Sequence, residues 1–330
     1  PSFSIASCSL INIRSNIKLY RRMALKTHST NIQLAYAKYL IQIAKLFGSG
    51  SSSKDTTAST ETPSQIRYRL LTEAGYWIER LARTGKPEAL FIQGRWYLLG
   101  PNASEDEGCV LKAYTVKVQE SKAFKCFLKA SRGGWTEAHY ELAQLWKKRG
   151  QYARAIQCYE KGANANHTPS IYKMAKVYLR GQLKKKKNIR KGMDYLKKAA
   201  DMEDAASAEP AFVLGCIYAH EYDRIEDSAL NNKLALNYLR KSADFGYADA
   251  IYFMGQVYET GMLGQLCDVW QAFQFYTKAA DVDHAGAMLD LSRIYCQGIP
   301  SLLAAQHELA FKWCKRSADL GFDQAEYVLG

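Results

Sequence analysis

One spaced pattern of small and aromatic residues recurs along this chain and constrains its fold more than any other feature. A small residue is followed five positions later by a second small residue, and three positions after that by an aromatic residue. Repetition at fixed offsets indicates a repeat protein, and we expect each copy to form one helix, called helix A. The second small residue and the aromatic residue of the copies are Gly94 and Tyr97, Ala143 and Trp146, Ala175 and Tyr178, Gly215 and Tyr218, Gly255 and Tyr258, and Ser292 and Tyr295.

A second pattern follows each complete copy of the first and predicts a second helix, called helix B. It has a small residue, a large residue four positions later, a basic residue after two more, and a small residue directly after that. The basic residue suits the negative end of the helix dipole. The final small residues of the copies are Ala130, Gly162, Ala199, Ser242, Ala279 and Ser317, and a divergent earlier copy ends at Leu81.

The residue types in the two patterns have a physical explanation. Small residues on one face allow two helices to approach closely, and large residues fill the grooves between them. We therefore expect Gly255 and Ala279 to be buried where helices cross. The aromatic residues are expected to bury large areas between successive repeats. Glycines such as Gly246, four residues before a helix A small position, predict a tight turn because glycine adopts left-handed conformations readily.

The length of the repeat varies along the chain. Ala143 and Ala175 are 32 residues apart, whereas Gly94 and Ala143 are 49 apart, and tetratricopeptide repeats hold close to about 34. Variable helix pairs with alanine-rich B helices resemble the Sel-one-like repeat. The strongest matches are YLKKAADME, YLRKSADFGYADAIYFMGQVYETG and YTKAADVDHAGAMLDLSRIYCQG. The resemblance implies an all-α, right-handed α/α solenoid of helix pairs, related to the tetratricopeptide fold, with no sheet.

The distribution of apolar residues divides the chain into four parts. Residues 1–15 are expected to be disordered, and residues 16–47 carry two apolar-periodic runs that predict a divergent N-terminal helix pair. Residues 48–65 are rich in Gly, Ser and Thr, so we expect a flexible linker with little to bury. The repeats are predicted to occupy residues 66–330, with the last repeat truncated.

Charge and cysteine usage bound the environment of the protein. The net charge of +13 favours anionic partners. The eight cysteines are spread singly, without a CxxC motif, as is typical of reduced proteins of the cytosol. No stretch approaches the roughly 20 apolar residues of a spanning helix, and the N-terminal residues do not resemble a signal peptide. These features predict a cytoplasmic protein.

A basic run between one helix A and its helix B is the candidate binding site with the highest charge. The structural interpretation is a solvated loop that follows the end of helix A at Gly181. The functional interpretation is a contact with anionic lipid or an acidic partner, worth up to ~1 kcal/mol per basic residue near a membrane. Nucleic acid is not expected, since no aromatic residues interleave with the lysines. The candidate contact residues are Lys184, Lys185, Lys186, Lys187, Arg190 and Lys191.

The residues that usually carry catalysis or bind metals do not form a convincing site. The six histidines are isolated, and no HExxH motif or Cys/His ligand spacing occurs. Asp281 and Asp283 beside His284 form the single cluster of acids with a histidine, and they fall in a predicted turn from helix B to helix A, where Asp is commonly a cap. We predict no enzyme activity, no cofactor and no metal.

Three segments resemble the fungal chitin synthase activator family: LAYAKYLIQIAKLF, RLLTEAGYWIERLARTGKPEALFIQGRWYLLG and AFKCFLKASRGGWTEAHYELAQLWKKRG. The resemblance extends over residues 16–330. It implies a non-catalytic scaffold that binds and positions a membrane chitin synthase in wall or septum synthesis. The implied location is the cytoplasm, with recruitment to the cytosolic face of the plasma membrane at division or growth sites. The concave face of the solenoid is the expected binding platform.

Two alternatives come from other classes of protein. Adaptors of ER-associated protein quality control are built from the same repeats, but they need a signal sequence. Hydrolase activity is attributed to cysteine-rich bacterial relatives, which carry paired cysteines at a fixed place in each repeat; this chain lacks such pairs. The scaffold interpretation is therefore preferred.

Overall fold

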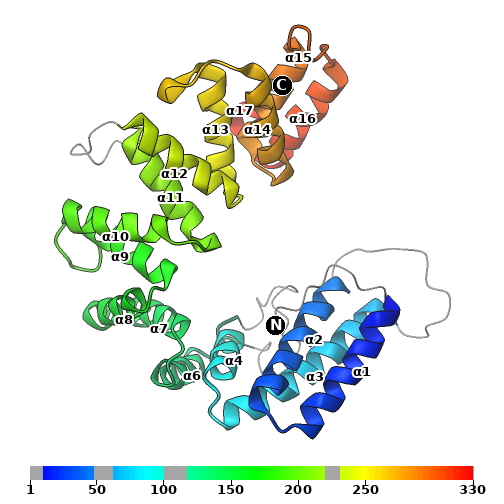
Figure 1. Ribbon diagram of the computed structural model, residues 1–330, viewed down its shortest axis with the longest axis vertical. Helices are drawn as coiled ribbons and strands as arrows, with labels where there is room; N and C mark the ends of the chain where they lie inside the picture. Colours follow the sequence, from blue (N-terminus) through cyan, green and yellow to red (C-terminus); the bar gives the residue numbers. More distant parts are fainter. Residues whose placement is uncertain (1–9, 48–61, 100–116, 220–230, 330) are drawn as a thin grey trace. The chain divides into compact units, whose positions relative to one another are not determined.

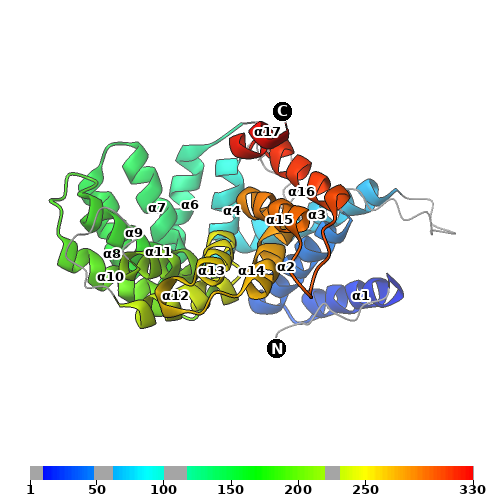
Figure 2. The same ribbon diagram turned by 90° about the horizontal axis from the view of Figure 1, so that it is seen from above.

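The computed structural model describes residues 10–47, 62–99, 117–219 and 231–329 (Figure 1). Within these residues the chain forms α-helices and no β-strand, which confirms the predicted all-α fold. The helices divide into two compact units, Pro1–Ala165 and Asn166–Gly330. Within each unit the helices succeed one another in chain order (Figure 2).

The described residues of the first unit form three closely packed helix pairs and one additional helix. In each pair, α2 with α3, α4 with α6 and α7 with α8, the partners pack on each other more extensively than on other helices. The additional helix, α1, lies against α2. The helices are α1 (Leu10–Lys26), α2 (Thr30–Leu46), α3 (Pro63–Arg83), α4 (Pro87–Leu99), α6 (Glu120–Arg132), α7 (Glu137–Lys148) and α8 (Tyr152–Asn164).

Two predicted boundaries and one predicted helix pairing at the N-terminal end change. Helix α1 begins at Leu10, within the stretch 1–15 that was expected to be disordered. Helix α3 begins at Pro63 rather than at 66, because Thr62 and Gln65 form a capping box that starts the helix there. The close pair is α2 with α3 rather than the two helices of residues 16–47. Most of the predicted linker, residues 48–61, lies outside the described residues.

The second unit contains four helix pairs followed by one short helix. Two 3₁₀ turns, Ala205–Ser207 and Met262–Gly264, lie in the connections. The pairs are α9 (Thr168–Arg180) with α10 (Ile189–Asp201), α11 (Ala208–Tyr218) with α12 (Asn232–Asp244), α13 (Ala248–Thr260) with α14 (Val269–Asp281), and α15 (Ala285–Gln297) with α16 (His307–Asp319), and the short helix is α17 (Asp323–Leu329).

Small residues of helix A face large residues of helix B within each pair. A Cβ atom added to Gly255 would lie 2.4 Å from Cε1 of Tyr276, and one added to Gly94 would lie 2.6 Å from Cε1 of Phe127. Gly255 and Ala279 are both buried. The close approach of the two helices therefore depends on the absence of a side chain on helix A.

In three repeats of the second unit the aromatic residue of helix A stacks on helix B of its own pair, because it follows the small crossing residue by three positions and faces the same neighbouring helix. We expected the aromatics to pack between successive repeats, and two of them do: Trp146 meets Phe124 of α6, and Tyr295 meets Phe273 of α14, each edge to face on the preceding pair. The stacked rings are Tyr178 on Tyr195 at 5.8 Å, Tyr218 on Tyr238 at 6.1 Å and Tyr258 on Phe275 at 5.5 Å between centroids.

One backbone hydrogen bond closes the connection from helix A to helix B, whatever its length. The residue that caps the start of helix B donates its N–H to the carbonyl oxygen of the helix A aromatic. Insertions between these two anchor points leave the pair intact, which explains the variable repeat length. The bonds join Gln119 to Tyr97, Asn188 to Tyr178, Asn231 to Tyr218, Asp268 to Tyr258 and Gln306 to Tyr295, at 2.7–3.2 Å.

The turns from helix B to the next helix A use a left-handed residue, except the turn from α10 to α11, which contains a 3₁₀ turn. Gly134 and Gly246 have φ angles of 87° and 80°, and an added Cβ at either would meet nothing within 4 Å. Asn166 and Asp283 take the equivalent places with φ angles of 57° and 60°. These two residue types tolerate this region better than most, because their short polar side chains can hydrogen-bond locally.

Candidate functional site

The outward side of the A helices in the second unit is the candidate binding surface. Several of these side chains bridge successive A helices, and most of them are at least partly exposed. Their spacing of three or four residues places them in one row along each helix. We call this surface the A-helix face and define it by Tyr172, Lys176, Glu209, Phe212, Tyr252, Phe253, Gln256, Asp290 and Arg293.

Tyrosine hydroxyls connect successive A helices by donating to carboxylates. On α9 the Tyr172 hydroxyl and the Lys176 ammonium both donate to Glu209 of α11, each at 2.8 Å. On α13 the Tyr252 hydroxyl donates to Asp290 of α15 at 2.9 Å. Burial raises the pKa of Tyr252, and the neighbouring Asp290 raises it further. The hydroxyl therefore remains a protonated donor at physiological pH.

Glu259 is the centre of a polar cluster that joins three of these helices. It accepts hydrogen bonds from the Tyr276 hydroxyl at 2.6 Å and from Nη2 of Arg293 at 2.5 Å. Arg293 also donates to Asp290 at 3.1 Å. Burial alone lowers the pKa of Arg293, but its bonds to Glu259 and Asp290 outweigh burial and raise it. The cluster holds α13, α14 and α15 together and fixes the direction of the guanidinium.

Aromatic side chains lie between the polar bridges. Phe212 of α11 contacts Phe253 of α13 edge to face, with centroids 6.3 Å apart, and also contacts Tyr247 at 5.3 Å. Both phenylalanines are partly exposed. An apolar centre bordered by carboxylates and cations is the composition of a protein-binding surface. The A-helix face is therefore a candidate for contact with another chain.

The predicted basic contact begins in the connection between α9 and α10 and continues into the first turn of α10, which holds Arg190 and Lys191. The 184–187 lysines and Arg190 are exposed, and α9 ends at Gly181 in a left-handed conformation with φ 64°. Lys191 differs from the others, because its ammonium lies 6.0 Å from the centroid of the Tyr178 ring and joins the stack of that repeat. The loop stays a candidate contact for an anionic surface, with Lys191 also serving the fold.

The repeat-defining residues take two kinds of environment. The small ones are buried at the contacts between helices, and the aromatic ones are partly exposed at the edge of each pair. The buried small residues are Gly94, Ala130, Ala143, Ala175, Ala199, Gly215, Gly255 and Ala279, and the partly exposed aromatics are Tyr97, Trp146, Tyr178, Tyr218, Tyr258 and Tyr295. They build the scaffold rather than the binding surface.

The cluster of acids around His284 is structural. His284 caps α15 by accepting the backbone N–H of Ala287 at 3.0 Å, and its ring stacks on Tyr252 at 4.4 Å. Burial lowers the pKa of His284, which favours the neutral form that the cap requires. Asp283 pairs with Arg316 at 2.7 Å on the next helix B. The arrangement explains these residues without catalysis.

Two features are absent from the residues that the structure describes. These residues contain no group of three or more His, Cys, Asp or Glu side chains placed to hold a metal ion. The helices they form are too short or too polar for any of them to cross a bilayer.

The tyrosine–carboxylate bridges were missed by the sequence analysis. Their partners are one repeat apart, at separations of 37 residues for Tyr172 and Glu209 and 38 for Tyr252 and Asp290. A tyrosine and an acid separated by one repeat length are therefore the signal that identifies them. The repeat templates concentrated on small and aromatic positions and left the outward side of helix A without an assignment.

Paired helices, the capped connections and the A-helix face together define an α/α repeat scaffold. The Sel1 repeat model matches residues 112–135, 136–167, 168–204, 211–247, 248–284 and 285–322, which is more than half of the chain. The chain belongs to the Sel1 repeat family.

Curated relatives are named as regulators of chitin synthase. The chitin synthase regulator SKT5 of Malassezia restricta is 28% identical over 98% of this chain, and SKT5 of Saccharomyces cerevisiae is 23% identical over 98%. Chitin synthase regulatory factor 3 of Schizosaccharomyces pombe is 28% identical over 74%. The chain spans 22%, 45% and 25% of these three proteins, respectively.

Solved structures with the same repeat share the fold. A protective antigen of uropathogenic Escherichia coli has a TM-score of 0.64 at 19% identity, covering 95% of this chain and 58% of its own. A Sel1 repeat protein from Oxalobacter formigenes has a TM-score of 0.60 at 21% identity, covering 76% and 94%. These likenesses and the repeat matches identify the fold of the chain as an α/α scaffold of Sel1 repeats. The alternative of an ER quality-control adaptor is not favoured by the curated relatives.

Proposed function

We propose that this chain regulates a chitin synthase by binding it and positioning it in wall or septum synthesis, without chemistry of its own. The observation that carries the proposal is the similarity over 98% of the chain to two proteins named chitin synthase regulators. The proposed place of action is the cytosolic side of the plasma membrane at sites of division or growth.

The A-helix face supports a role in binding. Phe212 and Phe253 provide an apolar centre, and Lys176 and Arg293 provide cations whose positions are held by carboxylates. Side chains held by their neighbours lose less conformational freedom on binding, so more of the contact energy contributes to affinity. We assign the contact with the synthase to this face.

The basic loop supplies a second contact in this proposal. Its exposed lysines at 184–187 are suited to anionic headgroups beside the membrane-bound synthase. Replacing them with glutamine should weaken membrane association, and the loss should be larger at low salt, because salt screens such contacts. Since this loop lies outside the packed helices, the fold should survive the change.

The test is co-purification from fungal cells together with measurement of cell-wall chitin. A tagged copy of the chain should recover a chitin synthase, and deletion of the gene should lower wall chitin. The double variant Phe212→Ala with Phe253→Ala should reduce recovery at least tenfold, since buried aromatic anchors dominate such interfaces. Normal chitin in the deletion strain, together with no recovered synthase, would show that the proposal is wrong.

A matched variant separates loss of binding from general damage. Phe311 on α16 is 59% exposed and lies outside the A-helix face. Phe311→Ala removes the same side chain and should leave recovery of the synthase unchanged. Circular dichroism and thermal unfolding of each purified variant check that the helices remain folded.

A further inference from the structure

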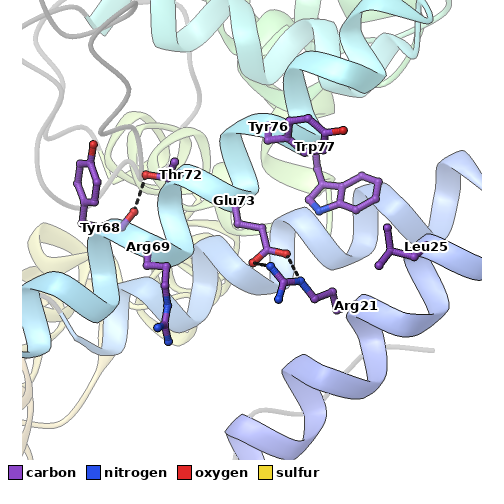
Figure 3. A pocket seen from close by; sticks show the side chains of 8 residues that line it. All are labelled: Arg21, Leu25, Tyr68, Arg69, Thr72, Glu73, Tyr76 and Trp77. Atoms are coloured by element: carbon purple, nitrogen blue, oxygen red, sulfur yellow. Dashed lines mark hydrogen bonds and ion pairs between the residues drawn. The ribbon is translucent and has the colours of Figure 1, made fainter. Parts of the chain in front are cut away.

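A groove between α1 and α3 in the first unit has no role in the fold or in the proposed function. Its volume is about 640 Å³. Leu25 of α1 and Tyr68 and Tyr76 of α3 line it, with exposed fractions of 54%, 55% and 58% (Figure 3). Large apolar side chains that stay this exposed along one groove indicate a surface that another molecule covers.

The back of the groove is held in place by hydrogen bonds and ring contacts. Glu73 accepts from Nε of Arg21 at 2.8 Å and from the Tyr36 hydroxyl at 2.9 Å, which ties α1, α2 and α3 together. Trp77 is buried behind Glu73 and meets the rings of Tyr36 and Tyr76 edge to face. The groove therefore exists before anything binds, as is usual for binding sites.

The helices that form the groove are strongly basic. Helix α1 carries five basic residues and no acidic one, and α3 carries four arginines against two glutamates. Among the described residues, no ion pair engages four exposed cations of α1: Arg14, Lys18, Arg22 and Lys26. Concentrated positive charge beside an apolar groove attracts a partner that is acidic and apolar at once.

We propose that this groove binds an acidic segment of a partner protein, with apolar side chains against Leu25, Tyr68 and Tyr76 and carboxylates against the cations of α1. A second copy of this chain is a poor occupant of the same groove, since two such basic surfaces repel each other. A flat bilayer contacts protruding side chains, whereas these apolar residues lie along a concavity that a polypeptide fills. The proposal goes beyond the regulation of chitin synthase and does not depend on it.

Selection from a random 16-residue peptide library displayed on phage tests the proposal with the full chain as bait. The enriched peptides should combine Asp or Glu with Leu, Ile or Phe. Fluorescence polarisation of a labelled enriched peptide should show at least a tenfold weaker Kd for Arg22→Glu and for Tyr76→Ala. The matched controls Lys312→Glu and Tyr327→Ala change exposed residues of the second unit and should leave the Kd unchanged.

Three outcomes would overturn the proposal. They are the absence of any enriched peptide, enriched peptides without acidic residues, and equal binding by Arg22→Glu, Tyr76→Ala and the parent chain. A parallel sedimentation assay uses vesicles of phosphatidylserine and phosphatidylcholine. Vesicle binding that is lost in Arg22→Glu, with no enriched acidic peptide, would assign the surface to a membrane instead. Tyr68→Ala provides a second groove variant should Tyr76→Ala fail to fold.

Discussion

The two compact units are built from the same helix pair but differ in how that pair begins its second helix. In the second unit Asn188, Asn231 and Asp268 cap helix B with their side chains. In the first unit Gln119 and Gln151 occupy the cap and make no side-chain bond. Side-chain caps thus begin three B helices of the second unit, where Gln306 before α16 makes no such bond. In the first unit Thr62 caps α3 with its side chain, and this unit also carries the additional helix α1 and the groove.

A carboxylate that bridges three helices is nevertheless common to both units. Glu73 in the first unit and Glu259 in the second each accept from a tyrosine hydroxyl within their helix pair and from an arginine on a third helix. Partly buried carboxylates need such partners, since an unpaired charge away from water is costly. Side-chain bridges that join three helices therefore stabilise the repeats of both units, whether or not helix B has a side-chain cap.

The largest expected effect comes from filling the close contact between the helices of a pair. Gly255→Leu should destabilise the second unit by on the order of 3 kcal/mol, because its new side chain meets a Tyr276 ring that Glu259 anchors. Gly94→Leu should cost less, since Phe127 has no hydroxyl to anchor it. Urea unfolding and helix-by-helix hydrogen exchange measure the difference. Equal costs would show that the anchor of the ring is irrelevant, and an unchanged midpoint for Gly255→Leu would show that the site is open.

Removal of the bridging carboxylates should have the next largest effect. Glu73→Ala and Glu259→Ala should each lower the free energy of unfolding by about 1–3 kcal/mol, since a buried tyrosine hydroxyl loses its acceptor. Glutamine at either position keeps an acceptor for the hydroxyl and should cost less. Similar losses in the two units would support a shared device. A loss of stability in one unit alone would show that the carboxylate bridge is not a shared stabilising feature.

The turn glycines should give smaller and equal effects in the two units. Gly134→Ala and Gly246→Ala place a Cβ in open space, so only the left-handed backbone opposes them, at about 1 kcal/mol. Asn166→Gly should change the free energy of unfolding by only a few tenths of 1 kcal/mol, because asparagine already tolerates the left-handed conformation. Thermal unfolding of the three variants measures this. An unchanged melting temperature for either alanine variant would show that the two units do not share a glycine-dependent turn.

Acidification should weaken both units through one histidine in each. Burial lowers the folded-state pKa of His139 in the first unit and of His284 in the second below the usual value of 6.5. The unfolded chain therefore binds the proton first, so the stabilising contribution is present above pH 6.5 and is lost as the pH falls through the folded-state pKa. Urea midpoints at pH 7.5 and pH 5.5 should differ less for His284→Asn, which keeps a capping side chain. If the pH dependence of the urea midpoint is unaltered in this variant, His284 does not contribute to the loss of stability on acidification.

The candidate surfaces were less accessible to sequence analysis than the scaffold. The lysines at 184–187 stand out in the sequence as a run, and the structure leaves them exposed in a loop as expected. Tyr172 and Glu209, by contrast, are 37 residues apart and unremarkable singly. Tyr68, Tyr76 and Leu25 gave no sequence signal either, since an aromatic or leucine in a helix usually indicates core.

The sequence by itself determined the helix pair, the class of repeat and the positions of its small residues. These are local properties, because the spacing of glycine, alanine and aromatic residues along a helix decides which neighbour that helix can approach. Only the tertiary structure decided which aromatics stack within a pair and which pack between pairs, and that α2 pairs with α3. The groove beside α1 likewise came from the tertiary structure. Such features depend on which side chains from distant segments remain exposed once the helices have packed, and no spacing within one helix encodes that.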